Sequence, residues 1–295
     1  MTQAGPIPPA LERQFALFAR LHDDMPPPRA REDYPGVTSY YDITYAELVG
    51  FRPLVLDLHI PSGAGPFPVL MWVHGGGWQG GNRAMGHALQ LAQHGFAIAA
   101  PQYRLSGEAK YPAQVHDLKG AVRWLRANAA TYRLDADRIA GWGASADAHL
   151  VSLVALLEDA GDVGGNLEQS GALQAVVSYF MPSDLLAMAS PSGATPRDQM
   201  SANLLGYNVR ERPDAASQAS PITHARRDAP PFLILHGDAD PMVPPAQSQS
   251  FHAALRAAGA DSTFVTLPDA IHEDPAFWSE ETLSQVREFL GRALK

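Results

Sequence analysis

The chain of 295 residues contains no cysteine, which excludes disulfide bonds, thiolate nucleophiles and cysteine-based metal sites. Its 11 histidines include no H-E-x-x-H pair of the kind that zinc peptidases use. There is no Walker-type loop, and the glycine cluster that begins at Gly75 is too short and wrongly placed to cradle a phosphate. None of these motifs therefore points to a metal site or to a nucleotide cofactor.

Long apolar runs and an excess of positive charge are also missing. No stretch approaches the roughly 18 apolar residues of a membrane span, and the N-terminus lacks a basic segment followed by an apolar one. The net charge is -9, and no basic cluster could track a phosphate backbone. We expect no membrane span, no nucleic acid, a small neutral substrate, and a cytoplasmic location unless a secretion signal has been removed. The oligomeric state stays open.

Apolar residues are plentiful, at 46% of the chain, and suffice for one large domain with a full core. Short apolar runs alternate with helical patterns, which predicts a mostly parallel central sheet with helices on both faces, an α/β fold. The expected strands lie at about 40–45, 52–60, 67–73, 96–101, 138–142, 173–180, 231–235 and 262–267, and the expected helices at about 115–125, 146–158, 246–258 and 276–294.

Two segments fall outside this alternation. Residues 1–35 form an expected N-terminal extension with a short amphipathic helix at about 11–21, ended by three prolines, and residues 36–295 form the domain. Within the domain, residues 181–229 are rich in Pro, Ser, Ala and Met and predict a lid over the strand ends. Met181 would then line the acyl pocket. The alternative is a surface excursion whose methionines fill local core.

A glycine-rich loop, HGGGW at His74–Trp78, follows the apolar run that ends at Val73. Without a Cβ, its backbone N–H groups are open to a carbonyl oxygen, which is typical of an oxyanion hole. The expected donors are Gly76, Gly77 and, beside the nucleophile, Ala146. Trp78 is expected to form one side of the substrate pocket, with a packed core indole as the alternative.

Ser145 lies between a predicted strand and a predicted helix, in the segment GASA. This is the strand, sharp turn and helix of a nucleophile elbow. The alternative is a serine that only caps the helix. The glycine loop upstream favours the nucleophile.

An acid and a histidine follow in the order that this architecture requires. Asp240 comes after the strand at 231–235, and we prefer it to Asp238, which more often hydrogen-bonds the loop backbone. His272 comes just past the strand at 262–267, whereas most other single histidines are structural. These residue types predict that Ser145 attacks a carbonyl carbon, His272 takes its proton and Asp240 orients the imidazole.

With these motifs the chain resembles the α/β-hydrolase carboxylesterases, in particular the bacterial acetyl-xylan and feruloyl esterase-like group near the hormone-sensitive lipases. The resemblance runs from about Leu54 to Leu294 and includes the segments 103–109, 112–117 and 220–223. It implies the α/β-hydrolase fold with a small lid. It also implies hydrolysis of small neutral esters, with acetyl or aromatic acyl groups, through an acyl-enzyme and without a metal or any other cofactor. An amidase or peptidase of the same fold, or a non-catalytic ligand-binding homologue, is the alternative.

The chain departs from this family's pattern where glycines are usual, at Asp147, Ala148 and Ile271. An ionised Asp147 would oppose the negative charge that develops in the oxyanion hole. On that hypothesis Asp147→Gly raises turnover. The alternative is an exposed or salt-bridged acid with little effect.

Overall fold

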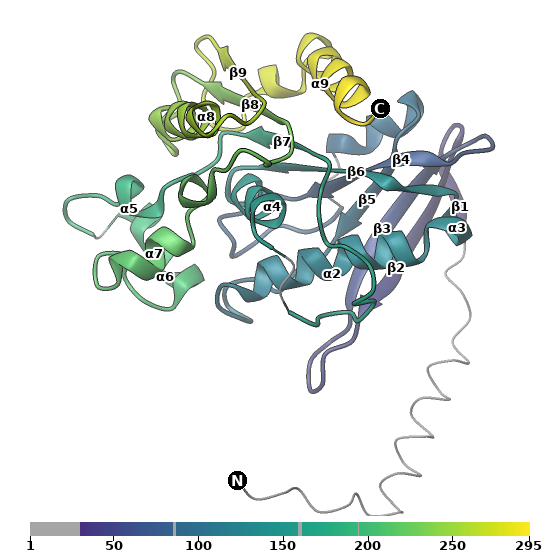
Figure 1. The fold of residues 1–295 in the computed structure, drawn as a ribbon, viewed down its shortest axis with the longest axis horizontal. Helices are drawn as coiled ribbons and strands as arrows, with labels where there is room; N and C mark the ends of the chain where they lie inside the picture. The colour runs from purple at the N-terminus through teal and green to yellow at the C-terminus, as the bar shows by residue number, and fades with distance from the viewer. Residues whose placement is uncertain (1–29, 85–86, 159–160, 194) are drawn as a thin grey trace, which may run out of the picture.

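A computed structural model describes residues 30–84, 87–158, 161–193 and 195–295 of the chain. They form a nine-stranded sheet in the order β1-β2-β3-β5-β4-β6-β7-β8-β9, with helices packed on it (Figure 1). The predicted α/β architecture is confirmed. The helix that we expected at 11–21 lies outside the described residues.

The sheet is antiparallel at one end and parallel over the rest. Strands β1 (Arg31–Tyr34), β2 (Val37–Ala46) and β3 (Leu54–Pro61) pair antiparallel with one another, and β3 pairs antiparallel with β5 (Ala97–Pro101). The remaining strands all run parallel, so their carboxyl ends meet at one edge: β4 (Phe67–Val73), β6 (Leu134–Ala144), β7 (Ala175–Tyr179), β8 (Phe232–Gly237) and β9 (Ser262–Leu267). Because β1 pairs with β2, the last residues of the expected extension belong to the sheet.

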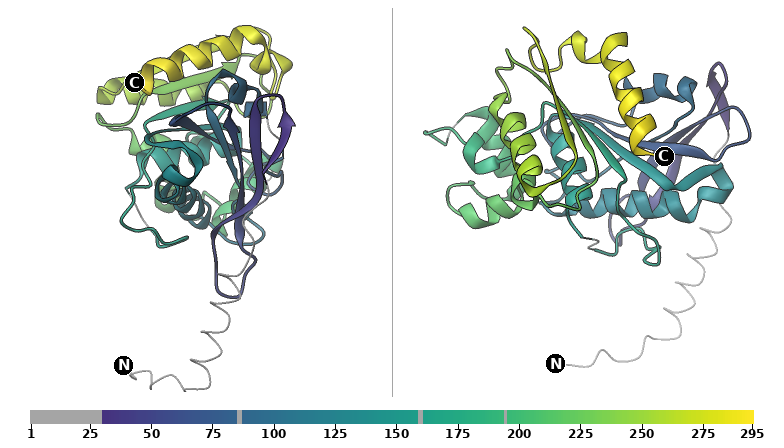
Figure 2. Two further views of the ribbon diagram at one scale, coloured as in Figure 1. Left: turned by 90° about the vertical axis from the view of Figure 1, so that its right-hand side faces the viewer. Right: turned by 45° about the horizontal axis from the view of Figure 1, so that its top comes forward.

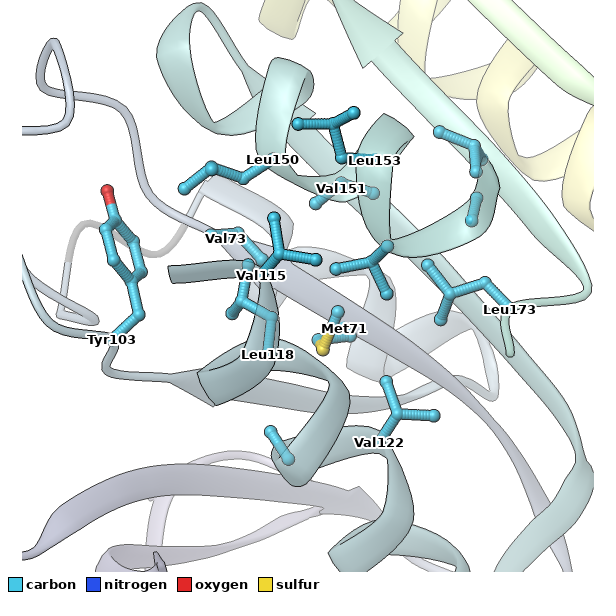
Figure 3. Packing of buried hydrophobic residues seen from close by; sticks show 14 of the residues in the cluster. Met71, Val73, Tyr103, Val115, Leu118, Val122, Leu150, Val151, Leu153 and Leu173 are labelled. Carbon is cyan, nitrogen blue, oxygen red and sulfur yellow. The ribbon is translucent and has the colours of Figure 1, made fainter. Parts of the chain in front are cut away.

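Each face of the sheet is buried by its own set of helices (Figure 2). One face packs against α2 (Ala113–Ala127), α4 (Ala146–Leu156) and α8 (Ala246–Ala258), and the other against η1 (His87–His94) and α9 (Glu280–Ala293). Successive residues of β4 alternate between the two cores, with Met71 on the first face and Trp72 on the second. Figure 3 shows Met71 among side chains of α2 and α4.

The C-terminal helix, predicted as one element over 276–294, is broken. A short 3-10 turn, η3 (Pro275–Trp278), precedes α9, and Ser279 between them has an extended backbone with φ −65° and ψ 153°. The Ser279 hydroxyl accepts the N–H of Thr282 and so caps the start of α9. A serine that satisfies a free helical N–H favours a helix start over helix continuation.

The segment between β7 and β8 lies where β7 ends (Figure 1). It carries α5 (Leu185–Met188), α6 (Pro196–Leu205), α7 (Pro213–Gln218) and η2 (Pro221–His224). Thr195 and Asp198 form a reciprocal capping box at the start of α6. The predicted insertion at 181–229 is thus built of short helices.

Two features are absent from the ranges that the structure describes. None of their helices combines the length and the apolar character that crossing a membrane requires. Nor do three or more of their histidine and acidic side chains gather in a group that could hold a metal ion.

Candidate active site

Ser145 lies in the sharp turn between β6 and α4. Its backbone has φ 57° and ψ −127°, a conformation that costs a residue with a Cβ of order 1–3 kcal/mol. The turn closes only because residue 143 is glycine, since a Cβ there would lie 2.6 Å from the backbone N of Ala148. The Ser145 N–H donates to the carbonyl of Tyr179, at 2.9 Å. Its hydroxyl makes no capping bond to α4, so it is free for another partner.

That partner is the imidazole of His272. His272 Nε2 lies 2.9 Å from Ser145 Oγ, and His272 Nδ1 lies 2.7 Å from Asp240 Oδ2. The ring of Phe180 packs edge-on against the imidazole, with the ring centroids 4.6 Å apart. The structure therefore brings together the three residues that we expected to form a triad, from the turns after β6, β8 and β9.

The carboxylate of Asp240 is held by four hydrogen bonds. Oδ1 accepts the N–H groups of Met242 and Val243, at 2.8 and 3.0 Å, and Oδ2 accepts from His236 Nε2 as well as from His272. Burial opposes ionisation of this group, but hydrogen bonds from the two histidines and from Val243 outweigh it and hold the pKa of the Asp240 carboxyl well below its usual range. Asp240 is therefore an anion that can stabilise a charged imidazole.

The alternative acid, Asp238, has a different role. Its side chain accepts the backbone N–H of Asp269, at 2.7 Å. It thereby ties the loop after β8 to the loop after β9, in agreement with the backbone role that aspartates often take in loops.

His236 is part of the site but was not singled out in the sequence. It is fully buried, with Nδ1 2.7 Å from Ser248 Oγ and Nε2 3.2 Å from Asp240 Oδ2 and 2.9 Å from the carbonyl of Val243. It therefore holds the same carboxylate oxygen that His272 contacts. The sequence signal that could have indicated this role is its position one residue before the end of β8, close to the loop that carries Asp240.

The glycine loop lies beside Ser145. The carbonyl of Gly76 accepts the N–H groups of Gln79 and Gly80, both at 3.0 Å, and a Cβ on Gly76 would lie 2.4 Å from the carbonyl oxygen of Gly80. Gly76 therefore shapes the turn. Gly77 and Ala146 border the cavity at Ser145. Within the described ranges no hydrogen bond uses the N–H group of Gly76, Gly77 or Ala146, so these three expected donors are available to an oxyanion.

The cavity beside Ser145 has a volume of about 40 Å³. Trp78 forms part of its wall, yet the residue is only 3% exposed and its ring packs edge-on against that of His149. Its indole is therefore packed in the core and also borders the cavity. Met188 and Met200 of the insertion form another part of the wall.

The expected position of Met181 needs correction. Its side chain is fully buried, and its sulfur accepts hydrogen bonds from the hydroxyls of Ser152 and Ser178, at 3.1 and 3.4 Å. It packs in the core against α4, and the next residue, Pro182, borders the cavity instead. The Met-rich wall that the composition predicted is made by methionines further along the chain.

Asp147 also differs from both readings of the sequence. Its side chain is fully buried, forms no ion pair within the described ranges, and accepts a hydrogen bond from the hydroxyl of Tyr103. Burial raises the pKa of the Asp147 carboxyl well above its usual value, although the Tyr103 bond acts against this. Burial therefore disfavours the ionised form that was expected to oppose an oxyanion. Ile271, by contrast, is 52% exposed, and its side chain costs no packing.

Tyr103 connects Asp147 to the glycine loop. The Tyr103 ring stacks on that of His74, with centroids 5.1 Å apart and planes 16° apart. Burial lowers the pKa of His74 and favours its neutral form. Asp147 is thus linked to the first residue of the glycine loop through the rings of Tyr103 and His74.

Comparison with known proteins agrees with this geometry. The family model BD-FAE matches residues 56–255. The chain is 35% identical over 260 residues to Esterase LipQ of Mycobacterium tuberculosis and 32% identical over 213 residues to Esterase LipC of the same organism. These alignments cover 84% and 70% of this chain, but only 59% of LipQ and 53% of LipC.

Solved structures share the fold. A truncated carbohydrate esterase from gut microbiota superposes with a TM-score of 0.78 at 30% identity, over 87% of this chain and 96% of that one. Esterase Est2 of Thermogutta terrifontis, with propionate bound, superposes with a TM-score of 0.71 at 24% identity, over 91% and 95%, and supports the fold alone. The chain belongs to the BD-FAE family and has the α/β-hydrolase fold of esterases.

Proposed function

We propose that the protein is a serine carboxylesterase that hydrolyses esters with short acyl groups through an acyl-enzyme intermediate. The observation that carries this proposal is the position of His272, whose two ring nitrogens lie within hydrogen-bond distance of the Ser145 hydroxyl and of the Asp240 carboxylate. The curated relatives with esterase names support the reaction class.

The first half of the reaction forms the acyl-enzyme. Ser145 Oγ attacks the ester carbonyl carbon while its proton passes to His272 Nε2. The carbonyl oxygen becomes an oxyanion, which the N–H groups of Gly76, Gly77 and Ala146 stabilise. When the tetrahedral intermediate collapses, the C–O bond to the alcohol breaks and His272 returns the proton to the leaving oxygen.

The second half repeats these steps with water. His272 takes a proton from a water molecule, which attacks the acyl-enzyme carbonyl, and the acid is released as Ser145 regains its proton. The ionised Asp240 stabilises the imidazolium in both halves and holds Nδ1 as the protonated nitrogen.

The size of the cavity supports a short acyl group. A single water molecule needs on the order of 10–15 Å³ of comparable space, so about 40 Å³ admits only a few heavy atoms. Methionine side chains can move to admit somewhat more.

The cytoplasmic location expected from the sequence remains a prediction.

Labelling with a fluorophosphonate tests the nucleophile. We expect one adduct, located by mass spectrometry on Ser145, and none in Ser145→Ala. The same variant should lose at least about a thousandfold of its activity on 4-nitrophenyl acetate. An adduct elsewhere, or substantial activity in Ser145→Ala, would reject the proposal. Matched acetate esters and acetanilides separate an esterase from an amidase, and we expect the ester to be strongly preferred.

A further inference from the structure

Arg197 stands out among the residues that border the cavity beside Ser145. Of the described residues in this wall, it alone carries a permanent charge, whereas its neighbours on the insertion side are Met188 and Met200. The side chain is half-buried. An arginine between methionines, close to a nucleophile, needs an explanation.

The guanidinium of Arg197 has a single partner in the described part of the chain. Its NH1 group donates to the carbonyl of Met242, at 3.2 Å, and no carboxylate in those ranges forms an ion pair with it. Other arginines are neutralised, such as Arg52 by Glu108 and Arg104 by Asp117. A guanidinium has five N–H donors, so most of those on Arg197 are left for another acceptor.

Helix stability does not account for this placement. Arg197 is the second residue of α6, where the positive end of the helix dipole disfavours a cation. The next residue, Asp198, provides the favourable charge there and accepts hydrogen bonds from Thr195 and Ser190. Arg197 therefore lies at the cavity at some cost to the helix.

We propose that Arg197 binds a carboxylate carried by the ester substrate, on its acyl part or on its alcohol part. This inference rests on the proposed esterase function and narrows its substrate class. A planar guanidinium fork matches a carboxylate with two parallel hydrogen bonds. The apolar walls at Met188 and Met200 limit the solvent that would screen the pair.

The net charge of the chain does not oppose this assignment at close range. The charge of -9 led us to expect a neutral substrate, because an anion is repelled from far away. At physiological salt such repulsion is largely screened beyond about 8 Å, whereas a contact pair in a half-buried site is screened much less. A single local cation can therefore decide the preference.

Two pairs of esters test the inference. On the alcohol side, 4-acetoxybenzoate is compared with methyl 4-acetoxybenzoate, and on the acyl side, monomethyl glutarate is compared with methyl butyrate. We expect Arg197→Gln to lower kcat/KM for the charged member of at least one pair by about tenfold or more, mostly through KM, and to change the neutral member by less than about threefold. Arg197→Lys should lie between, since it keeps the charge and loses the fork.

The control is Arg292→Gln, which removes the same charge at an exposed position of α9. In both ester pairs it should leave the ratio of kcat/KM for the charged ester to kcat/KM for the neutral ester unchanged. Fluorophosphonate labelling of Ser145 in every variant shows that the site is folded.

An equal loss on charged and neutral esters would mean that Arg197 only holds the Met242 loop, and would overturn the inference. An unchanged ratio in both pairs would overturn it too, while the esterase proposal would stand. A wild-type enzyme inactive on all four esters and unlabelled at Ser145 would instead reject the proposed function itself.

Discussion

The hydroxyl of Tyr103 donates a hydrogen bond to the carboxyl group of Asp147 in the interior of the protein, where neither side chain is exposed. This pair contacts the glycine loop, because Tyr103 also stacks on His74. Asp147→Gly would remove the support and leave a void. We therefore no longer expect that variant to raise turnover.

Asp147→Asn should flatten the pH dependence of stability. The folded state holds the Asp147 proton to a higher pH than the unfolded chain, whose aspartates ionise near 3.9. As pH rises from about 4 toward the folded pKa, wild-type stability falls by up to about 1.4 kcal/mol per pH unit through this group. Asparagine has a similar shape and no proton to lose. Urea unfolding at pH 5, 6 and 7 measures both slopes, and equal slopes would contradict the prediction.

His149→Gln should reduce the loss of stability in acid. Burial lowers the pKa of His149 to about 4, against a usual value of 6.5, although its hydrogen bond to the Ala219 carbonyl acts against this shift. Between those values the unfolded chain binds a proton that the folded chain does not, so acidification through this range costs up to about 3 kcal/mol. Glutamine can still donate to Ala219. Unfolding from pH 7 to 4.5 tests this, with His94→Gln at an exposed position as the control. If His149→Gln loses as much unfolding free energy on acidification as the wild type does, the prediction is wrong.

Ser145→Gly should be more stable than Ser145→Ala, although neither should turn over an ester. The positive φ of residue 145 strains any side chain with a Cβ, and glycine adopts it freely. Glycine loses more backbone entropy on folding, which offsets part of this gain. We therefore expect the free energies of unfolding of the two variants to differ by about 1 kcal/mol. Thermal or urea unfolding of the two variants decides the matter. If alanine is equally stable, the turn is not strained.

Met200→Ala should shift the preference toward longer acyl chains. The side chain borders the cavity, and its sulfur would lie 3.0 Å from a Cβ on Gly77. Each methylene that a hydrophobic pocket accepts is worth about tenfold or more in kcat/KM, so the hexanoate to acetate ratio should rise by at least that factor.

Met181→Ala is the matched control for this experiment. Because Met181 is buried outside the cavity, its replacement should leave the acyl-chain ratio unchanged and lower the free energy of unfolding by about 2–5 kcal/mol. A changed ratio in Met181→Ala, or an unchanged one in Met200→Ala, would show that the pocket wall lies elsewhere.

Local patterns in the sequence predicted several elements correctly. The strands at 67–73 and 262–267 and the helix at 246–258 match the structure at both ends. A continuous apolar run marks the first strand, and a glycine follows the helix, and both are local signals. The break at Ser279 was missed because it depends on a single side-chain hydrogen bond. The start of the sheet at Arg31 was missed because pairing with β2 is a long-range property.

The site shows the same division. The positions of Ser145, Asp240 and His272 follow from chain order and from where each strand ends. Sequence could not show which way a side chain turns, and this decided the positions of Met181 and Asp147. His236 was missed for a related reason, since its role depends on contacts with Asp240 and Ser248 that form only in the fold.

The triad and the insertion side of the cavity wall are carried by different parts of the fold. The hydroxyl, the imidazole and the carboxylate come from the turns after three parallel strands of the sheet, β6, β9 and β8, whereas Met188, Arg197 and Met200 come from short helices between β7 and β8. Substitutions in those helices can therefore retune which molecules are accepted without disturbing bond cleavage. Exchanging this segment between relatives therefore offers a route to new specificities while the sheet and the turns that carry the triad stay unchanged.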